Sequence, residues 1–524
     1  MTPLFSRSRH RFRIAASRIF SLALPFALPM LGLVCGLLIA VTGSSLLAEQ
    51  PQAATLKLAG IFADDMVLQR ETDAAIWGKA AANAEVSITP SWNGNASLAT
   101  ADSQGRWQTT LATPAAGGPY EIQIESGEQA VTLENVLVGE VWICSGQSNM
   151  QWKMRGFGPD EFKEDVDKAN YPNIRFCDVP QNLAFKEQQD VQSKWSICNP
   201  QTAYNFSAVA YFFGSRLHQE LDIPIGLIST NWGGSSAEAW TSQKKLQAEF
   251  PEFAETLASY PGLIEEIGEL QSRSQKKPKG INHRLPSVLY NSMIKPLMPM
   301  AMRGVIWYQG ESNVERPYQY RKLFPAMIRD WREQWGIGDF PFYFVQIAPF
   351  SYKTSPYPAA LLREAQAMTL SVPNTGMAVT MDIGNETNIH PKPKKPVGER
   401  LARLALRRTY GKSDLVDSGP EYQSMKVEGD RIRLSFDHVG SGLVSRDGEA
   451  LSHFAIAGDD QNFVPAKATI DGDTVVVHSE QVDTPVAVRF GWGNADAPNL
   501  SNQEGLPASS FRTDDWPVPR QGGK

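Results

Sequence analysis

The sequence predicts a parallel α/β sheet flanked on both sides by antiparallel β-sheet regions. In residues 138–412, apolar strand-like runs alternate with helical segments, which is the pattern of a parallel sheet. Residues 55–137 and 413–517 carry short strands with alternating polarity, separated by Gly, Asn and Pro, as in β-sandwiches. At 524 residues the chain is long enough for these three domains.

Residues 1–48 are expected to lie outside this fold. Five arginines between Arg7 and Arg18 precede an almost uninterrupted apolar run over 19–41, and small residues follow near Ala48. This order is typical of a secretory signal. The apolar run is also long enough to span a bilayer, so an uncleaved membrane anchor is the alternative. We therefore expect export to the periplasm or the cell exterior, with this segment as the only membrane contact.

Charge and cysteine content exclude some classes of function. The net charge is −6 and no long basic run is present, which argues against a nucleic-acid partner. Cys144 lies in an apolar run and is expected in the core, whereas Cys177 and Cys198 are candidates for a disulfide in an oxidising compartment. No Cys/His spacing typical of a metal site occurs, so neither a metal nor a cofactor is expected.

The central region contains five strand candidates and three clear helical segments between or after them. The strands are predicted at 141–146, 223–230, 304–310, 342–348 and 376–384, and the helices at 208–221, 323–335 and 398–411. Ligands of open α/β sheets bind beyond the carboxyl ends of the strands. The residues that follow the strands there are Ser148, Asn231–Ser236, Gln309–Asn313 and Asp382. Serine, glycine, amide and carboxylate groups together are typical of an acyl-transfer site.

A serine nucleophile needs a base, which is usually histidine. Of the seven histidines, only His283 and His390 fall in loops of the central region. His390 follows the last predicted strand, at the edge of the sheet where Ser148 is expected. Its position therefore makes His390 the candidate base, although a loop histidine that caps the next helix would have the same position.

Several motifs in order resemble the sialate O-acetylesterase family of SGNH-type carbohydrate esterases. They are GQSNM (146–150), IPIGLISTNWGGSSAEAW (223–240), PSVLYNSMIKPLMPMAMRGVIWYQGESN (286–313), IHPKPKKPVGERLA (389–402) and FGWGNADAPNLSNQEGLPASSFRTDDW (490–516). The resemblance implies a flavodoxin-like SGNH-hydrolase core with a five-stranded parallel sheet, attached β-sandwich-type regions and no metal.

The same resemblance implies roles for individual residues. Ser148 is the expected nucleophile and His390 the general base. Many SGNH enzymes place an aspartate three residues before the histidine, but Thr387 occupies that position here. Asp382 is the expected acid and Glu386 the alternative; a Ser–His dyad aided by a carbonyl is a third arrangement.

The expected oxyanion hole combines backbone and side-chain donors. Its backbone N–H groups come from Ser148 and from Gly233 or Gly234, where glycine permits close approach of the main chain. The side-chain amide of Gln309 or Asn313 completes it. Candidates for substrate contacts are Gln147, Asn291 and Glu311.

The resemblance implies a metal-free serine esterase that removes O-acetyl groups from sugars, first of all a sialate 9-O-acetylesterase acting on sialoglycans. Acetylxylan or another acetylated polysaccharide is the alternative substrate. Two rival functions remain: a glycosidase that uses Glu311 and Asp382 as paired carboxylates, and a carbohydrate-binding protein on an inactive esterase scaffold. The first would leave Ser148 and His390 without a role.

Overall fold

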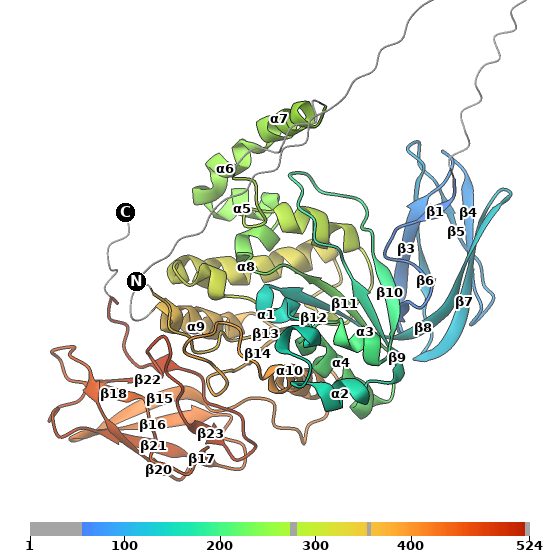
Figure 1. Ribbon diagram of the computed structural model, residues 1–524. Helices are drawn as coiled ribbons and strands as arrows, with labels where there is room; N and C mark the ends of the chain where they lie inside the picture. The colour runs from blue at the N-terminus through green and yellow to red at the C-terminus, as the bar shows by residue number, and fades with distance from the viewer. Residues whose placement is uncertain (1–54, 273–279, 354–357, 519–524) are drawn as a thin grey trace, which may run out of the picture. The chain divides into compact units, whose positions relative to one another are not determined.

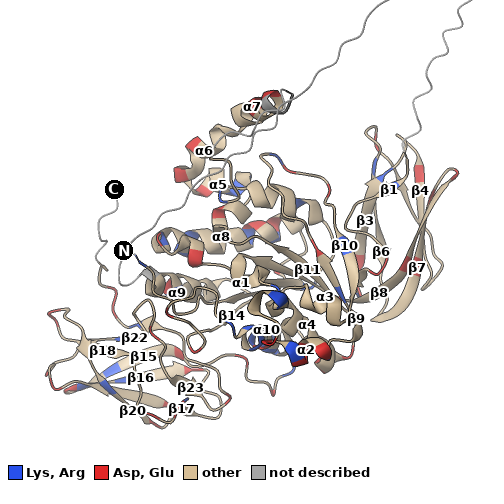
Figure 2. Cartoon of the chain, in the orientation of Figure 1, with Lys and Arg blue, Asp and Glu red and all other residues tan. Residues whose placement is uncertain are grey.

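The computed structural model describes residues 55–272, 280–353 and 358–518 (Figure 1). Ala53–Lys524 cluster into one compact unit, over whose elements acidic and basic residues are interspersed (Figure 2). The segment 1–48, interpreted above as a signal or anchor, lies outside the described residues. Within the described ranges, no helix is both long enough and apolar enough to cross a membrane.

The centre of the molecule is a sheet with parallel strands in the order β9-β11-β8-β12-β13-β14. These strands are β8 (Gln129–Gly146), β9 (Tyr171–Asp178), β11 (Ile225–Asn231), β12 (Gly304–Tyr308), β13 (Phe342–Val345) and β14 (Thr375–Ala378). All five predicted strands are present, and their spatial order, 2-1-3-4-5 by sequence, is that of flavodoxin-like sheets. The predicted parallel α/β core is therefore confirmed.

The sheet extends beyond the prediction at one edge. There β9 runs parallel to β11, and β10 (Lys194–Cys198) pairs antiparallel with β9. The apolar run of β9 is short and contains Arg175, so its sequence does not read as a core strand. In the structure the Arg175 side chain is buried, and its guanidinium donates hydrogen bonds to the carbonyl oxygens of Pro172, Asp65 and Asn135.

Helices cover both faces of the sheet. Successive side chains of β8 point to opposite faces, so Val141 and Ile143 join one hydrophobic cluster while Trp142 and Cys144 join the other. The predicted helices are α4 (Ala208–Leu221) and α10 (Lys394–Arg408), which pack together on the Trp142 face, and α8 (Pro317–Trp335). The other face is covered by α8 and α9 (Pro358–Met368).

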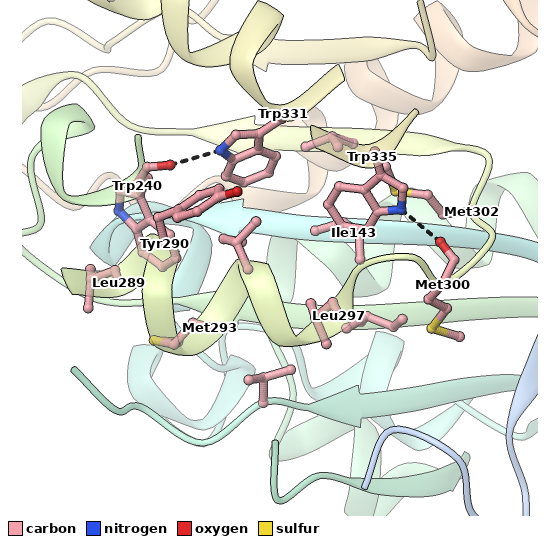
Figure 3. Packing of buried hydrophobic residues seen from close by; sticks show 14 of the residues in the cluster. Ile143, Trp240, Leu289, Tyr290, Met293, Leu297, Met300, Met302, Trp331 and Trp335 are labelled. Carbon is pink, nitrogen blue, oxygen red and sulfur yellow. Dashed lines mark hydrogen bonds between the residues drawn. The ribbon is translucent and has the colours of Figure 1, made fainter. Parts of the chain in front are cut away.

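The core on the α8 face is rich in tryptophan (Figure 3). The indole N–H groups of Trp331 and Trp335 donate hydrogen bonds to the carbonyl oxygens of Trp240 and Met300, both at 2.8 Å. These bonds satisfy polar atoms that would otherwise be buried at a cost in free energy. The bond from Trp331 also holds the segment between Gly234 and Trp240 against α8.

The remaining helical segments of the described residues lie mainly in the loops between the strands, and all except α7, with 13 residues, have seven residues or fewer. They are α1 (Ser148–Gln151), η1 (Met154–Phe157), α2 (Lys163–Asp167), α3 (Pro200–Tyr204), η2 (Ala237–Trp240), α5 (Gln243–Glu249), η3 (Pro251–Phe253), α6 (Ala254–Ala258), α7 (Tyr260–Ser272), η4 (Tyr290–Ile294), η5 (Lys295–Leu297), η6 (Glu311–Asn313) and η7 (Thr369–Ser371).

The N-terminal β region shares a strand with the core. Its strands are β1 (Lys57–Leu58), β2 (Val67–Gln69), β3 (Asp73–Lys79), β4 (Glu85–Pro90), β5 (Ser97–Thr100), β6 (Arg106–Ala112) and β7 (Gly117–Ser126). The first half of β8 pairs with β7, and its second half pairs with β11 and β12. The predicted boundary between residues 137 and 138 therefore falls within one continuous strand.

The C-terminal region is antiparallel and has a hydrophobic cluster of its own. Its strands are β15 (Glu421–Glu428), β16 (Arg431–Asp437), β17 (Leu443–Ser445), β18 (Phe454–Ala457), β19 (Val464–Pro465), β20 (Lys467–Asp471), β21 (Thr474–His478), β22 (Ala487–Phe490), β23 (Leu500–Asn502) and β24 (Phe511–Arg512). The buried Arg363 of α9 joins it to the core by donating hydrogen bonds to the carbonyl oxygens of Gly491 and Gly493.

The three described cysteines are buried free thiols. Cys144 has no exposed surface, as expected for a core residue. Cys177 and Cys198, considered as a disulfide pair from sequence, are not bonded to each other. Burial raises the pKa of each of these two thiols to about 12, so they are neutral and unreactive at neutral pH.

Candidate active site

Ser148 is placed by a sharp turn at the carboxyl end of β8. Gly146, the last residue of β8, has φ +134°, and a Cβ atom there would lie 2.2 Å from the carbonyl oxygen of Tyr308. Only glycine fits this position without moving β12. The chain then enters α1 with Ser148 as its first residue, between the ends of β11 and β12. The side chain of Ser148 is therefore partly exposed at the carboxyl edge of the sheet.

His390 reaches Ser148 from the loop between β14 and α10. Its Nε2 atom lies 2.8 Å from Ser148 Oγ, and its ring stacks on Trp152 with 4.9 Å between ring centroids. Partial burial and the nearby Lys394 cation lower the pKa of His390. The imidazole is thus neutral at neutral pH and can accept the serine proton.

The carboxylates expected to support His390 do not contact it. The two oxygens of Asp382 accept hydrogen bonds from the guanidinium of Arg400 at 2.7 and 2.6 Å. Glu386 is exposed and accepts from the hydroxyl of Ser351 at 3.3 Å. In the described part of the chain, His390 Nδ1 has no hydrogen-bond partner. The described residues therefore form a Ser–His pair, and the carboxylate of Asp382, the predicted acid, is hydrogen-bonded to Arg400 and makes no contact with His390.

The glycine turn after β11 lies against Ser148. A Cβ atom at Gly233 would be 3.3 Å from Ser148 Cβ, and Gly234 has φ +74°. The N–H of Gly233 donates to Gln151 Oε1 at 2.6 Å. The N–H of Ser148 has no acceptor within α1, because it opens the helix. Among the described residues, no hydrogen bond engages the N–H of Gly234. The N–H groups of Ser148 and Gly234 are therefore the backbone donors available to an oxyanion.

The side-chain amides expected in the oxyanion hole are bound elsewhere. Gln309 Nε2 donates to the carbonyl oxygen of Ser235 and to Asn313 Oδ1, and Asn313 Nδ2 donates to Glu238. Both amides are buried. Their hydrogen bonds hold the segment after the glycine turn in place, and neither amide is free to donate to a substrate.

The predicted substrate-contact residues are also part of the loop framework. Gln147 Oε1 accepts hydrogen bonds from the N–H groups of Gly310 and Ser312, and Asn291 Nδ2 donates to the carbonyl oxygen of Ala184. Glu311 Oε1 accepts from Asn149 Nδ2 at 2.6 Å. The side chains of Gln147, Asn291 and Glu311 are all buried.

Comparison with known proteins identifies the family of this chain. A family model described as carbohydrate esterase, sialic acid-specific acetylesterase, matches residues 138–407. The chain belongs to this family. It is accordingly a carboxylic ester hydrolase, a carbohydrate acetylesterase of the sialate O-acetylesterase type, and the family implies an acetylated carbohydrate as substrate. The resemblance seen in the motifs is thus confirmed.

Relatives of this esterase match most of its length. The sialate O-acetylesterase of Pongo abelii is 30% identical over 92% of this chain and 96% of its own length, and that of Homo sapiens is 29% identical with the same coverage. The crystal structure of a carbohydrate acetylesterase from Xanthomonas citri is 39% identical and has a TM-score of 0.78. It covers 88% of this chain and 100% of its own. This likeness confirms the fold, including β regions at both ends.

The paired-carboxylate alternative finds no support in the geometry. Glu311 is buried on Asn149, and Asp382 is bound to Arg400, so neither carboxylate faces an open cleft. In the described residues, no group of three or more His, Cys, Asp or Glu side chains could hold a metal ion.

Three residues near the dyad were missed in the sequence. They are Trp152, Asn149 and Lys394. The Trp152 ring stacks on His390, and the buried side chains of Asn149 and Lys394 form a hydrogen bond with each other. Asn149 and Lys394 lie within motifs used for the resemblance. However, their spacing of 245 residues hides the contact, and a lysine is rarely expected in a core.

Proposed function

We propose that this esterase removes O-acetyl groups from sugars through an acetyl-enzyme intermediate on Ser148. The observation that supports this mechanism is the 2.8 Å contact between His390 Nε2 and Ser148 Oγ at the carboxyl edge of the sheet. A serine hydroxyl alone is a weak nucleophile, and an adjacent neutral imidazole activates it.

In the first half of the reaction, Ser148 Oγ attacks the acetyl carbonyl carbon and His390 Nε2 takes the serine proton. The carbonyl oxygen becomes an oxyanion that the N–H groups of Ser148 and Gly234 stabilise. As the intermediate collapses, the C–O bond to the sugar breaks. His390 returns its proton to the departing sugar oxygen, and the acetyl group stays on Ser148.

In the second half, water attacks the acetyl group of Ser148 while His390 again accepts a proton. Collapse of this second tetrahedral intermediate releases acetate, and the proton returns to Ser148 Oγ. No atom or electron is required from a cofactor.

For the substrate, we propose an O-acetylated sialic acid first, because sialate O-acetylesterases match 92% of the chain. Acetylxylan or another acetylated polysaccharide is the second candidate, since the Xanthomonas citri relative, 39% identical, is described as a carbohydrate acetylesterase and not by sialic acid. Acetate release from a panel of 9-O-acetylated sialosides and acetylated xylans distinguishes them.

The proposed chemistry is tested by Ser148→Ala. The substitution removes one partly exposed hydroxyl, so the fold should be kept while acetate release falls by at least about a thousandfold. Acetate release by the purified variant is measured beside wild type, with circular dichroism as the control for folding. A folded Ser148→Ala variant with wild-type turnover would contradict the mechanism.

We also propose that the protein is exported, on the basis of the arginine-rich and apolar order of residues 1–48. Fractionation of cells that express the full chain tests this proposal. Recovery of the esterase only from the cytoplasm would contradict it.

A further inference from the structure

Asn149 joins the three loops that form the active site. Its Nδ2 atom donates hydrogen bonds to Glu311 Oε1 at 2.6 Å and to the carbonyl oxygen of Ile389 at 3.1 Å. Its Oδ1 atom accepts one from Lys394 Nζ at 2.5 Å. The three side chains are buried, with exposed fractions of 1% for Asn149, 7% for Glu311 and 0% for Lys394.

A contribution to fold stability alone does not explain why these polar side chains are buried together. Among the described residues, Lys394 and Glu311 have no salt-bridge partner within 4 Å, and Glu311 Oε2 has no hydrogen-bond partner. Burial lowers the pKa of Lys394 to about 7 and raises the pKa of Glu311. Two buried ionisable groups separated by an amide cost free energy that their attraction repays only in part. Replacement of a buried ion pair by apolar side chains of similar volume is often neutral or stabilising.

The contacts instead lie directly beside the reactive groups. Asn149 follows Ser148 in the chain, Ile389 precedes His390, and Lys394 opens α10 four residues after His390. One amide therefore ties the main chain at the nucleophile to the main chain at the base. Among the residues that the structure describes, the imidazole has no carboxylate partner that could do this.

We propose that Lys394 and Asn149 are positioning residues that hold the His390 loop against Ser148, in place of a carboxylate on the imidazole. The inference rests on the proposed function of the dyad. Glu311 completes this set of hydrogen bonds. It accepts from Nδ2 of Asn149 and so fixes the amide orientation in which Oδ1 faces Lys394.

Lys394 has a second, electrostatic effect on His390. The charged groups on the elements around the imidazole are Lys392, which pairs with Glu161; Asp382, which pairs with Arg400; and Glu386, Glu311 and Lys394. Of these, only the Lys394 charge contributes to the lowered pKa of His390, together with burial. A like charge disfavours the imidazolium, so His390 stays neutral to a lower pH.

The test uses Lys394→Met, which removes the charge and the donor but keeps the length of the side chain. Hydrolysis of p-nitrophenyl acetate is followed, because this small neutral ester needs no sugar contacts. We expect kcat at pH 8 to fall at least about tenfold with little change in KM. We also expect the acidic limb of kcat/KM to move to higher pH, because loss of the Lys394 charge removes one of the two causes that lower the pKa of His390.

Lys394→Gln separates the two effects, because it keeps a donor for Asn149 but carries no charge. This variant should recover part of the lost kcat at pH 8 while its acidic limb stays shifted. Lys395→Met is the matched control, since Lys395 is exposed and pairs with Asp165 on α2. It should leave both kcat and the acidic limb at their wild-type values.

A double-mutant cycle with Asn149→Ala tests whether the two residues act together. If they form one positioning chain, the kcat loss of the double variant is smaller than the product of the two single losses. Wild-type kcat and an unmoved acidic limb in folded Lys394→Met would overturn the proposal, as would losses that only follow the folded fraction. Failure of the proposed function would differ, because Ser148→Ala would then retain the hydrolysis.

Discussion

Among the described residues, Ser148 is the only side chain that hydrogen-bonds to the His390 ring, so the nearby carboxylates contribute in other ways. Asp382 and Arg400 form a nearly buried two-bond ion pair that ties the end of β14 to α10. The pair fixes the two ends of the loop that carries His390. Asp382 thus stabilises the loop that carries His390. In a triad, its carboxylate would instead accept a hydrogen bond from the imidazole.

Asp382→Asn should therefore reduce turnover by less than about tenfold, whereas loss of a true triad aspartate costs about 10⁴. The main effect should be on the free energy of unfolding, lower by about 1–3 kcal/mol, because Arg400 loses a charged acceptor. Steady-state kinetics and urea unfolding measure the two effects. Glu386→Gln is the control, since Glu386 is exposed, and it should change neither. A turnover loss of about 10³ or more in folded Asp382→Asn would restore the triad.

At the scale of elements, the strand-turn-helix connection from β8 to α1 sets the position of Ser148, the proposed nucleophile. The backbone at Gly146 has a φ that side chains disfavour, and the carbonyl of Tyr308 fills the space where a Cβ would lie. Gln147 adds hydrogen bonds from its side chain to the loop after β12. Ser148 is thus held by the residues before it, Gly146 and Gln147, which favours a pre-organised site.

Gly146→Ala should destabilise the fold and displace Ser148, because both the φ angle and the 2.2 Å contact oppose it. We expect a loss of about 3 kcal/mol or more in unfolding free energy. Gly158→Ala is the matched control: Gly158 also has a positive φ, +98°, but no atom lies within 4 Å of the place that a Cβ would take. It should cost about 1 kcal/mol. Equal stabilities of the two variants by urea unfolding would contradict the packing argument.

At the scale of the whole molecule, the sequence predicted the features that repeat along the chain. Periodicity identified five parallel strands and the helices α4, α8 and α10, and residues that follow strands located Ser148 and His390 at one edge. It did not identify β9, because a buried arginine interrupts its apolar run. Nor did it show that β8 continues from the N-terminal sheet into the core. The pattern of residues changes from alternating to continuously apolar within β8, but the strand itself is not interrupted.

The parts of the site that sequence could not predict depend on contacts between distant residues. Asp382 is hydrogen-bonded to Arg400 and not to His390, and Lys394 donates a hydrogen bond to Asn149, which lies 245 residues earlier in the chain. The amides of Gln309 and Asn313 are directed into the framework by Ser235 and Glu238. Side-chain partners of this kind are chosen by packing in three dimensions, and no local pattern encodes them.

The central claim is that Ser148 carries the acetyl group and that no metal takes part. It is tested most directly by treating the EDTA-dialysed enzyme with a phosphonylating reagent and locating the modification by mass spectrometry. We predict full activity after dialysis, then loss of acetate release in proportion to labelling, with one label on Ser148. Loss of activity on dialysis that a divalent metal restores, or full labelling of Ser148 without loss of activity, would contradict the account.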